Sequence, residues 1–257
     1  ALNERTVLAS IMYANNETGA IQPITEIAKI IRDFRNSKIF RHPEQSEGSK
    51  LDSSPSASGG AAQNDSRGIY PLFHTDAVQA FQYLNCNVDD LGVDLLTLSA
   101  HKIYGPKGVG ALYIRSTKSQ VPNNKQISNN KNQNWNLGLG FWNLPTVTPL
   151  VTGGGQEFGL RSGTENVPAI VGFGKAVELV EQMREKENAR IAALRAYAWR
   201  GIKKIFPKAQ LNGPNDIPTF LRMLECRLPN NLNFYIPPRQ GSGQAKVSGE
   251  QILVALD

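Results

Sequence analysis

The feature that most constrains this chain is an apolar run that ends in a histidine and a lysine. Residues 93–99 read VDLLTLS, Ala100 follows, and His101 and Lys102 stand where the run stops. A glycine-rich turn then leads into a second apolar run, GVGALYIR, at residues 108–115. A short run with little polar alternation is typical of a strand covered on both faces. We therefore expect a strand, a tight turn that carries Lys102, and a returning strand.

Strand and helix patterns alternate along the first half of the chain. Residues 6–14 and 70–75 are short, mostly apolar strand patterns. Between them, residues 23–34 begin with a proline and continue with apolar side chains at helical spacing, which predicts a helix. Strand, helix and strand in this order predict an α/β fold with a mostly parallel sheet. The apolar face of the helix consists of Ile24, Ile27, Ile31 and Phe34.

A long helical pattern opens the second half. Residues 168–206 carry apolar side chains every three or four positions, with one gap near Glu187, and so predict one helix or two. Residues 228–236 read as a strand, and residues 249–257 read as the beginning of an amphipathic helix. We assign residues 1–183 to a large domain and residues 184–257 to part of a smaller one. The long apolar stripe consists of Ile170, Phe173, Val177, Val180, Met183, Ile191, Leu194, Tyr197 and Ile202.

Three stretches interrupt this pattern. Residues 36–68, 116–149 and 237–246 are rich in Ser, Gly, Pro, Asn or Gln. They contain too little apolar surface to offset the entropy lost on ordering. Because structureless loops of this length are uncommon in compact domains, we interpret the stretches as insertions that are mobile at least in part.

Composition argues against several classes of function. The net charge is +6, and residues 116–149 supply half of it from three lysines, so the charge does not indicate a nucleic-acid partner. No apolar run approaches the length of a membrane span, and no signal-peptide pattern occurs. The two cysteines, Cys86 and Cys226, form no CxxC or Cys/His cluster, so neither a disulfide framework nor a metal site is indicated. We expect a cytoplasmic protein without a membrane partner.

Polar side chains follow three successive strand patterns. The segment ANNETG follows the first, DAVQ at 76–79 ends the second, and SAHK at 99–102 ends the third. In open α/β sheets, ligands bind beyond the carboxyl ends of the strands. A lone lysine at a strand end is usually a surface residue, but Lys102 shares its edge with the carboxylate of Asp76. A Schiff-base lysine and a carboxylate for a pyridinium nitrogen are what pyridoxal 5′-phosphate (PLP) requires, so this set favours a PLP site.

Four longer motifs resemble those of the cysteine desulfurases, PLP-dependent enzymes of fold type I in the class V aminotransferase group. They are NNETGAIQPI, HTDAVQ, VDLLTLSAHKIYGPKGVGALYIR and GGGQEFGLRSGTENVPAIVGFGKA. The resemblance covers residues 6–35, 70–115 and 150–257, and RSGTENV is especially specific to the family. It implies an aspartate aminotransferase-like fold, with a mixed, mostly parallel sheet flanked by helices in a PLP-binding domain and part of a smaller α+β domain.

The resemblance also implies how the cofactor ring is held. Lys102 carries the cofactor covalently, and Asp76 pairs with its pyridinium nitrogen. Gln79 bonds the phenolic oxygen of the ring, and Asn16 lies beside it.

The implied phosphate site extends to a second subunit. Ser99 and His101 hold the phosphate, and Thr164 reaches the phosphate of the neighbouring subunit, so the resemblance implies a homodimer. The implied reaction takes sulfur from L-cysteine, leaves L-alanine and forms a persulfide on a catalytic cysteine. The sulfur then passes to an acceptor protein, for iron–sulfur cluster assembly or tRNA thiolation.

Some of the family pattern is missing from this sequence. The nucleophilic cysteine and the arginine for the substrate carboxylate would follow Asp257, and Cys86 and Cys226 do not match the nucleophile's position. We therefore expect an internal piece of a longer protein, inactive by itself. Another class V enzyme (a selenocysteine lyase or an aminotransferase) and a non-catalytic remnant of the fold stay open as alternatives. His74, on the same side of its strand as Asp76, is interpreted as a packing residue.

Overall fold

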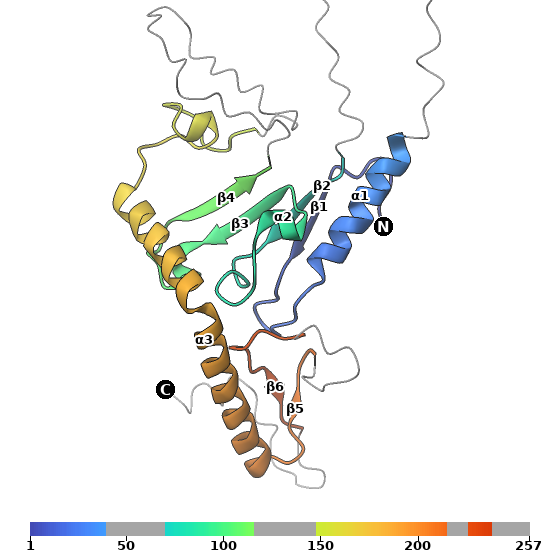
Figure 1. The fold of residues 1–257 in the computed structure, drawn as a ribbon, viewed down its shortest axis with the longest axis vertical. Helices are drawn as coiled ribbons and strands as arrows, with labels where there is room; N and C mark the ends of the chain where they lie inside the picture. The colour runs from blue at the N-terminus through green and yellow to red at the C-terminus, as the bar shows by residue number, and fades with distance from the viewer. Residues whose placement is uncertain (40–69, 116–147, 215–225, 238–257) are drawn as a thin grey trace, which may run out of the picture. The chain divides into compact units, whose positions relative to one another are not determined.

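The computed structural model describes residues 1–39, 70–115, 148–214 and 226–237 (Figure 1). Most of the three predicted insertions and the predicted helix at 249–257 lie outside the described residues. The chain divides into two compact units. The first comprises Ala1–Ala14 and Gln22–Met183, and the second comprises Asn15–Ile21 and Arg184–Asp257. The assignment of residues 1–183 and 184–257 to a large and a small domain stays a prediction.

A mixed four-stranded sheet forms the centre of the first unit (Figure 1). Strands β1 (Leu8–Met12), β2 (Leu72–Asp76) and β3 (Leu95–Ser99) are parallel, and β4 (Gly110–Ile114) is antiparallel to β3. The strands are arranged in chain order, β1-β2-β3-β4. The predicted mostly parallel sheet is confirmed, and the carboxyl ends of its three parallel strands meet at one edge.

Helix α1 (Ile24–Ile39) packs against this sheet through the face that the sequence predicts. Ile24 and Ile31 are buried together with Ala28, whereas Ile27 and Phe34 are half-buried at the margins of the stripe. The helix continues through residues 36–39, which the composition had assigned to an insertion. Residues 36–39 extend a helix that begins in a strongly amphipathic segment, and propagation adds one hydrogen bond for each residue fixed.

The described residues bury the sheet mainly on one face, although Leu72 at the start of β2 is buried on the other. Phe73, Thr75 and Leu96 are buried, whereas on the opposite face Thr97 is half-buried and Leu112 is exposed. Residues 93–99 therefore form the predicted strand, but its burial within the described part of the chain is one-sided rather than complete.

Helix α3 (Val167–Ile205) is a single helix of 39 residues, one of the two forms that the sequence pattern allowed. Its first half buries Phe173 and Val180 as predicted, whereas Ile170 and Met183 are exposed. Alanines take part in the buried stripe because their small side chains allow close approach to the turn after β3. The resulting core cluster consists of Ala100, Ile103, Phe173, Ala176 and Val180. Neither α3 nor any other helix in the described ranges has the apolar length that crossing a bilayer demands.

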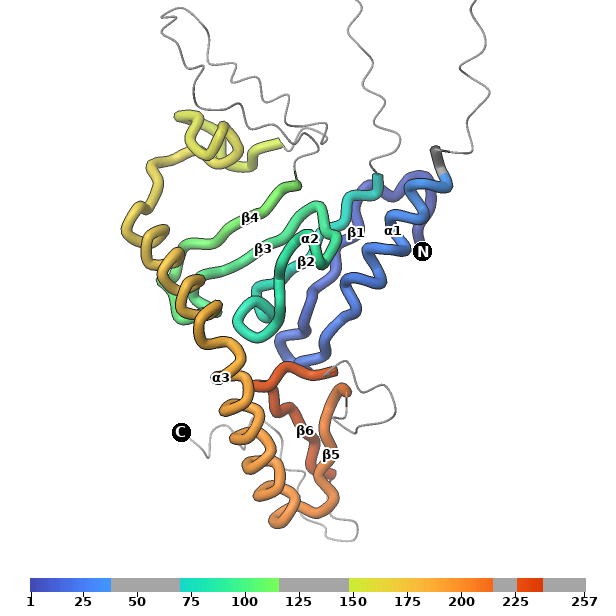
Figure 2. Tube along the Cα trace, in the orientation of Figure 1, coloured from blue at the N-terminus to red at the C-terminus, as the bar shows by residue number. Residues whose placement is uncertain are grey.

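The second unit contains a small antiparallel pair of strands, β5 (Gln210–Leu211) and β6 (Phe234–Tyr235) (Figure 2). Trp199 on α3 contacts the ring of Phe234, with 6.0 Å between centroids. The predicted strand at 228–236 is therefore largely wrong, since only its residues 234–235 pair. Residues 229–230 form a turn instead, in which the N–H of Asn231 donates to the carbonyl of Leu228 at 3.3 Å, and Asn231 Nδ2 donates to the carbonyl of Glu17 at 2.7 Å.

Candidate functional site

Lys102 lies in a single 3₁₀ turn, η3 (Ala100–Ile103), directly after β3. The two outer residues of the turn, Ala100 and Ile103, are buried against α3, whereas His101 and Lys102 between them are exposed. Tyr104 closes the turn in the left-handed conformation, with φ at 63°, and its N–H donates to the carbonyl of Ala100. Since both ends of the turn are anchored, the backbone of Lys102 is fixed while its amine reaches solvent.

Two glycines let the chain return closely around this turn. A Cβ on Gly105 would lie 3.0 Å from the carbonyl oxygen of Ala100, and a Cβ on Gly110 would lie 2.6 Å from that of Leu98. Real Cβ atoms essentially never approach a backbone atom as closely as the second distance. The glycine-rich segment is thus explained by the packing of the β3–β4 connection.

Ser99 and His101 form a polar pair beside the lysine. The Oγ atom of Ser99 lies 2.8 Å from Nδ1 of His101. This contact engages one ring nitrogen and leaves the other directed elsewhere, so the pair presents hydroxyl and imidazole groups at the end of β3. Such groups are suitable donors for an anion.

Asp76 ends the neighbouring strand, β2, and pairs in register with Thr97 of β3. Its Oδ1 atom accepts a hydrogen bond from the backbone N–H of Val78 at 2.9 Å, which turns the chain away from the sheet. Gln79 is half-buried in the turn that follows. Among the contacts of the described residues, this leaves the second carboxylate oxygen of Asp76 for another donor.

The predicted site residues are not all placed alike. Asp76 ends β2 and Gln79 follows it, while Ser99 ends β3 and His101 and Lys102 follow it, so these five residues gather at the carboxyl ends of the two strands. The other two predicted site residues do not follow β2 or β3 in this way. Thr164 is exposed in the loop before α3, and Asn16 belongs to the second compact unit.

His74 has a role that the sequence interpretation missed. Its Nδ1 lies 2.7 Å from Oγ of Ser10 on β1, and its Nε2 lies 3.3 Å from Oγ1 of Thr97 on β3. Burial lowers the pKa of His74, although the nearby Asp76 carboxylate acts in the opposite direction. Instead of packing only, His74 bridges three strands. The strand register that brings the two hydroxyls to its ring is not visible in the sequence.

Tyr83 interacts with Tyr104, the residue that closes the lysine turn. Burial and, to a smaller extent, the nearby Tyr104 raise the pKa of Tyr83 to about 12. A phenol that titrates so far above neutrality does not serve as a base at neutral pH. Tyr83 is therefore not a candidate for the general base of this site.

The described residues contain no group of three or more His, Cys, Asp or Glu side chains that could hold a metal ion. Cys86 is half-buried in the first unit, and Cys226 is exposed in the second. Neither cysteine lies in the turn that carries Lys102.

In sequence, the chain is similar to curated cysteine desulfurases from several bacteria. A cysteine desulfurase named IscS from Dictyoglomus turgidum is 38% identical over 257 residues, which is all of this chain and 45% of that protein. One from Clostridium botulinum is 36% identical over the same length, again with 45% of that protein covered. The chain thus spans about half the length of the curated relatives that it matches.

Solved structures agree with this result. A NifS-like protein superposes with a TM-score of 0.60 at 30% identity, over 91% of this chain and 45% of that one. A NifS-like protein from Rickettsia africae gives 0.57 at 30% identity, over 90% of this chain and 44% of that one. The predicted fold, that of fold-type I PLP enzymes, is confirmed.

The family match covers the site itself. Residues 67–223 match the family described as Aminotransferase class-V, and this range contains β2, β3 and the turn with Lys102. Enzymes of this family depend on PLP. The matched range covers more than half of the chain and includes both the anchored lysine turn and the carboxylate at the end of β2. The chain therefore belongs to the aminotransferase class-V family.

Proposed function

We propose that this chain is part of a PLP-dependent cysteine desulfurase, which takes sulfur from L-cysteine and leaves L-alanine. The observation that carries the proposal is the exposed Lys102 in its anchored turn, at the same sheet edge as Asp76. The cysteine desulfurases among the relatives support this choice within the family.

The residues at this edge fit PLP by their chemistry. The cofactor presents an aldehyde, a ring nitrogen, a phenolic oxygen and a phosphate, and when bound it supplies an electron sink. Lys102 offers an amine that is exposed and, within the described residues, forms no ion pair. Oδ2 of Asp76, which accepts no hydrogen bond from the residues that the structure describes, suits a protonated ring nitrogen, and the Ser99–His101 pair suits a phosphate.

The remaining contacts are proposed on the resemblance. Gln79 would bond the phenolic oxygen, and Asn16 would lie beside it. Thr164 would reach the phosphate in a second copy of the chain, so we propose that the enzyme works as a homodimer. The sulfur would pass to an acceptor protein, for iron–sulfur cluster assembly or tRNA thiolation. On the cysteine usage we propose a cytoplasmic setting.

The first experiment tests the cofactor assignment. The whole encoded protein is incubated with PLP, reduced with borohydride and mapped by peptide mass analysis. We expect the adduct on Lys102, its loss in Lys102→Ala and its retention in Lys107→Ala, which removes another exposed lysine five residues further on. An adduct on a different lysine, or none, refutes the assignment.

The second experiment tests the reaction. L-cysteine, L-selenocysteine and a 2-oxo acid with an amino donor are offered separately to the holoprotein, and alanine, sulfide and persulfide are measured. We expect alanine and a persulfide from L-cysteine. A preference for selenocysteine or amino transfer supports another class V enzyme instead, and no turnover supports a non-catalytic protein.

A third measurement concerns the two cysteines of this chain. Because neither matches the nucleophile's position, we propose that residues 1–257 alone do not transfer sulfur. Alkylation trapping after incubation with PLP and L-cysteine should map no persulfide to Cys86 or Cys226. A Lys102-dependent persulfide on either one would contradict this.

A further inference from the structure

His74 lies at the middle of β2 and faces the same side of the sheet as Asp76, two residues further on. Both of its ring nitrogens are engaged by hydroxyl groups, one on β1 and one on β3. Its side chain therefore connects the three parallel strands two residues before the end of β2, where Asp76 lies.

The strand register places these ties next to Asp76. Ser10 pairs with His74, and two residues on, Met12 pairs with Asp76. On the other side, Asp76 pairs with Thr97, the residue whose hydroxyl contacts His74. Both residues that pair with Asp76 are therefore close to the His74 contacts. Met12 lies two residues after Ser10, and Thr97 itself contacts the His74 ring.

The ring can satisfy both contacts while it is neutral. A neutral imidazole has one donor and one acceptor, and a hydroxyl can play either part. Burial lowers the pKa of His74 and so favours this uncharged form. Because His74 is then uncharged, it does not form an ion pair with Asp76, and the carboxylate can pair with a cationic group of a ligand.

We propose that His74 is a positioning residue for Asp76: by bridging Ser10 and Thr97 it fixes the end of β2 and directs the carboxylate of Asp76 toward the cofactor's ring nitrogen. The inference rests on the proposed function, since it requires PLP at this edge. It differs from a purely structural role, which would change the stability of the fold and leave the bound cofactor unaltered.

The test compares cofactor properties in the whole encoded protein and its variants. His74→Leu removes both contacts, while Ser10→Ala and Thr97→Val each remove one with little change of shape. Ile31→Val serves as the control, because it destabilises the buried face under α1 without touching this edge. PLP affinity is measured on the apoproteins, and the visible band of the saturated proteins is titrated with pH.

We expect His74→Leu to bind PLP about two- to tenfold more weakly. This ratio of affinities corresponds to the net contribution of one ordinary hydrogen bond. The Lys102 adduct should still form. The midpoint of the visible band should move to higher pH, because a less firmly protonated ring nitrogen withdraws less charge from the Lys102 linkage. The single-hydroxyl variants should show smaller changes in the same direction, and Ile31→Val none.

The outcomes separate the two hypotheses. If His74→Leu binds PLP and titrates like the unaltered protein, the positioning role is wrong. If His74→Leu does not fold, the same result in both Ser10→Ala and Thr97→Val shows that the role is wrong. If the unaltered protein itself forms no Lys102-linked band, the proposed function is wrong and the role of His74 falls with it.

Discussion

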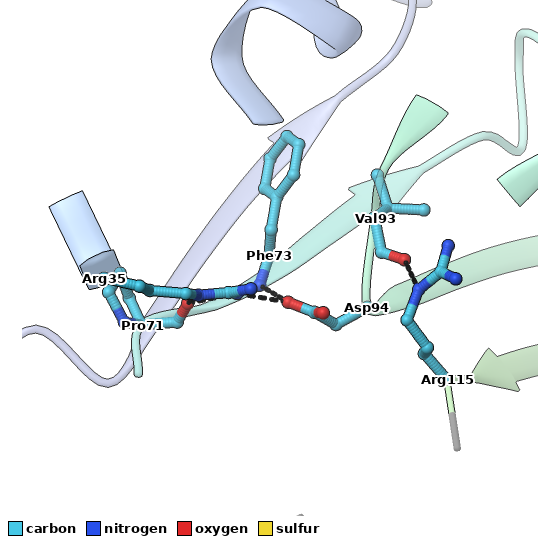
Figure 3. A network of polar contacts seen from close by, with 6 residues as sticks. All are labelled: Arg35, Pro71, Phe73, Val93, Asp94 and Arg115. Atoms are coloured by element: carbon cyan, nitrogen blue, oxygen red, sulfur yellow. Dashed lines mark hydrogen bonds and ion pairs between the residues drawn. The ribbon is translucent and has the colours of Figure 1, made fainter. Parts of the chain in front are cut away.

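The Arg35–Asp94 ion pair connects helix α1 to the amino ends of β2 and β3, and removing it should cost much of the stability of the first unit (Figure 3). Nη2 of Arg35 bonds Oδ2 of Asp94, and Nε of Arg35 donates to the carbonyl of Pro71 at 2.9 Å. The same Asp94 oxygen accepts from the N–H of Phe73 at 2.8 Å. Arg115 N–H adds a bond to the carbonyl of Asp94 at 2.8 Å.

The magnitude follows from burial. The side chains of Arg35 and Asp94 are only 18% and 13% exposed. Removing one partner of a buried pair costs about 3–5 kcal/mol, whereas an exposed pair contributes about 0–1 kcal/mol. Because this pair is mostly buried, we expect Arg35→Met to lower the free energy of unfolding by about 3 kcal/mol. Asp94→Asn keeps an oxygen for Phe73 and should cost less, about 1–2 kcal/mol.

The assay is urea unfolding followed by circular dichroism, with Lys175→Met as the matched control. Lys175 pairs with Glu178 on the surface of α3, and both side chains are more than half exposed, at 59% and 53%. We expect the control to change the free energy of unfolding by less than about 1 kcal/mol. Equal losses in Arg35→Met and Lys175→Met would refute the reasoning from burial. PLP affinity should not change in Arg35→Met, since the Arg35–Asp94 pair lies at the amino ends of the strands and Asp76 lies at the carboxyl end of β2.

Three further predictions concern the site and its supports. Phe173→Ala should lower the free energy of unfolding by about 3–5 kcal/mol and weaken PLP binding, because Phe173 belongs to the cluster that anchors the lysine turn; urea unfolding and cofactor titration measure both. Gly110→Ala should destabilise by about 1–3 kcal/mol, since the new Cβ would meet the backbone oxygen of Leu98, and an unchanged melting temperature would contradict the close packing. His74 has a folded-state pKa below its ordinary 6.5, so the unfolded chain binds more protons between the two values. The stability advantage of the wild type over His74→Asn should therefore be complete above about pH 6.5 and shrink as the pH falls toward the folded-state pKa, as unfolding curves at several pH values would show.

Some features of the chain depend on neighbours in the sequence, and these could be predicted. The apolar run before Lys102, the glycines after it and Pro23 before α1 predict a strand, a turn, a returning strand and a helix, all of which the structure contains. The same local patterns end each strand with polar residues, so Asp76, Ser99 and Lys102 are recognisable as one candidate site. The alternation of apolar and polar positions reports only which side of an element is buried.

Other features depend on segments far apart in the sequence, and only the tertiary structure decided them. The buried stripe of α3 includes Ala176 because the turn with Lys102 packs there. The spacing of apolar residues along α3 does not predict which segment packs against it. Arg35 meets Asp94 because α1 packs against β2, beside the residue that precedes β3. Ser10 and Thr97 reach His74 only once the strand register is set. Register and packing partners are chosen by long-range contacts, so no local pattern of residues contains them.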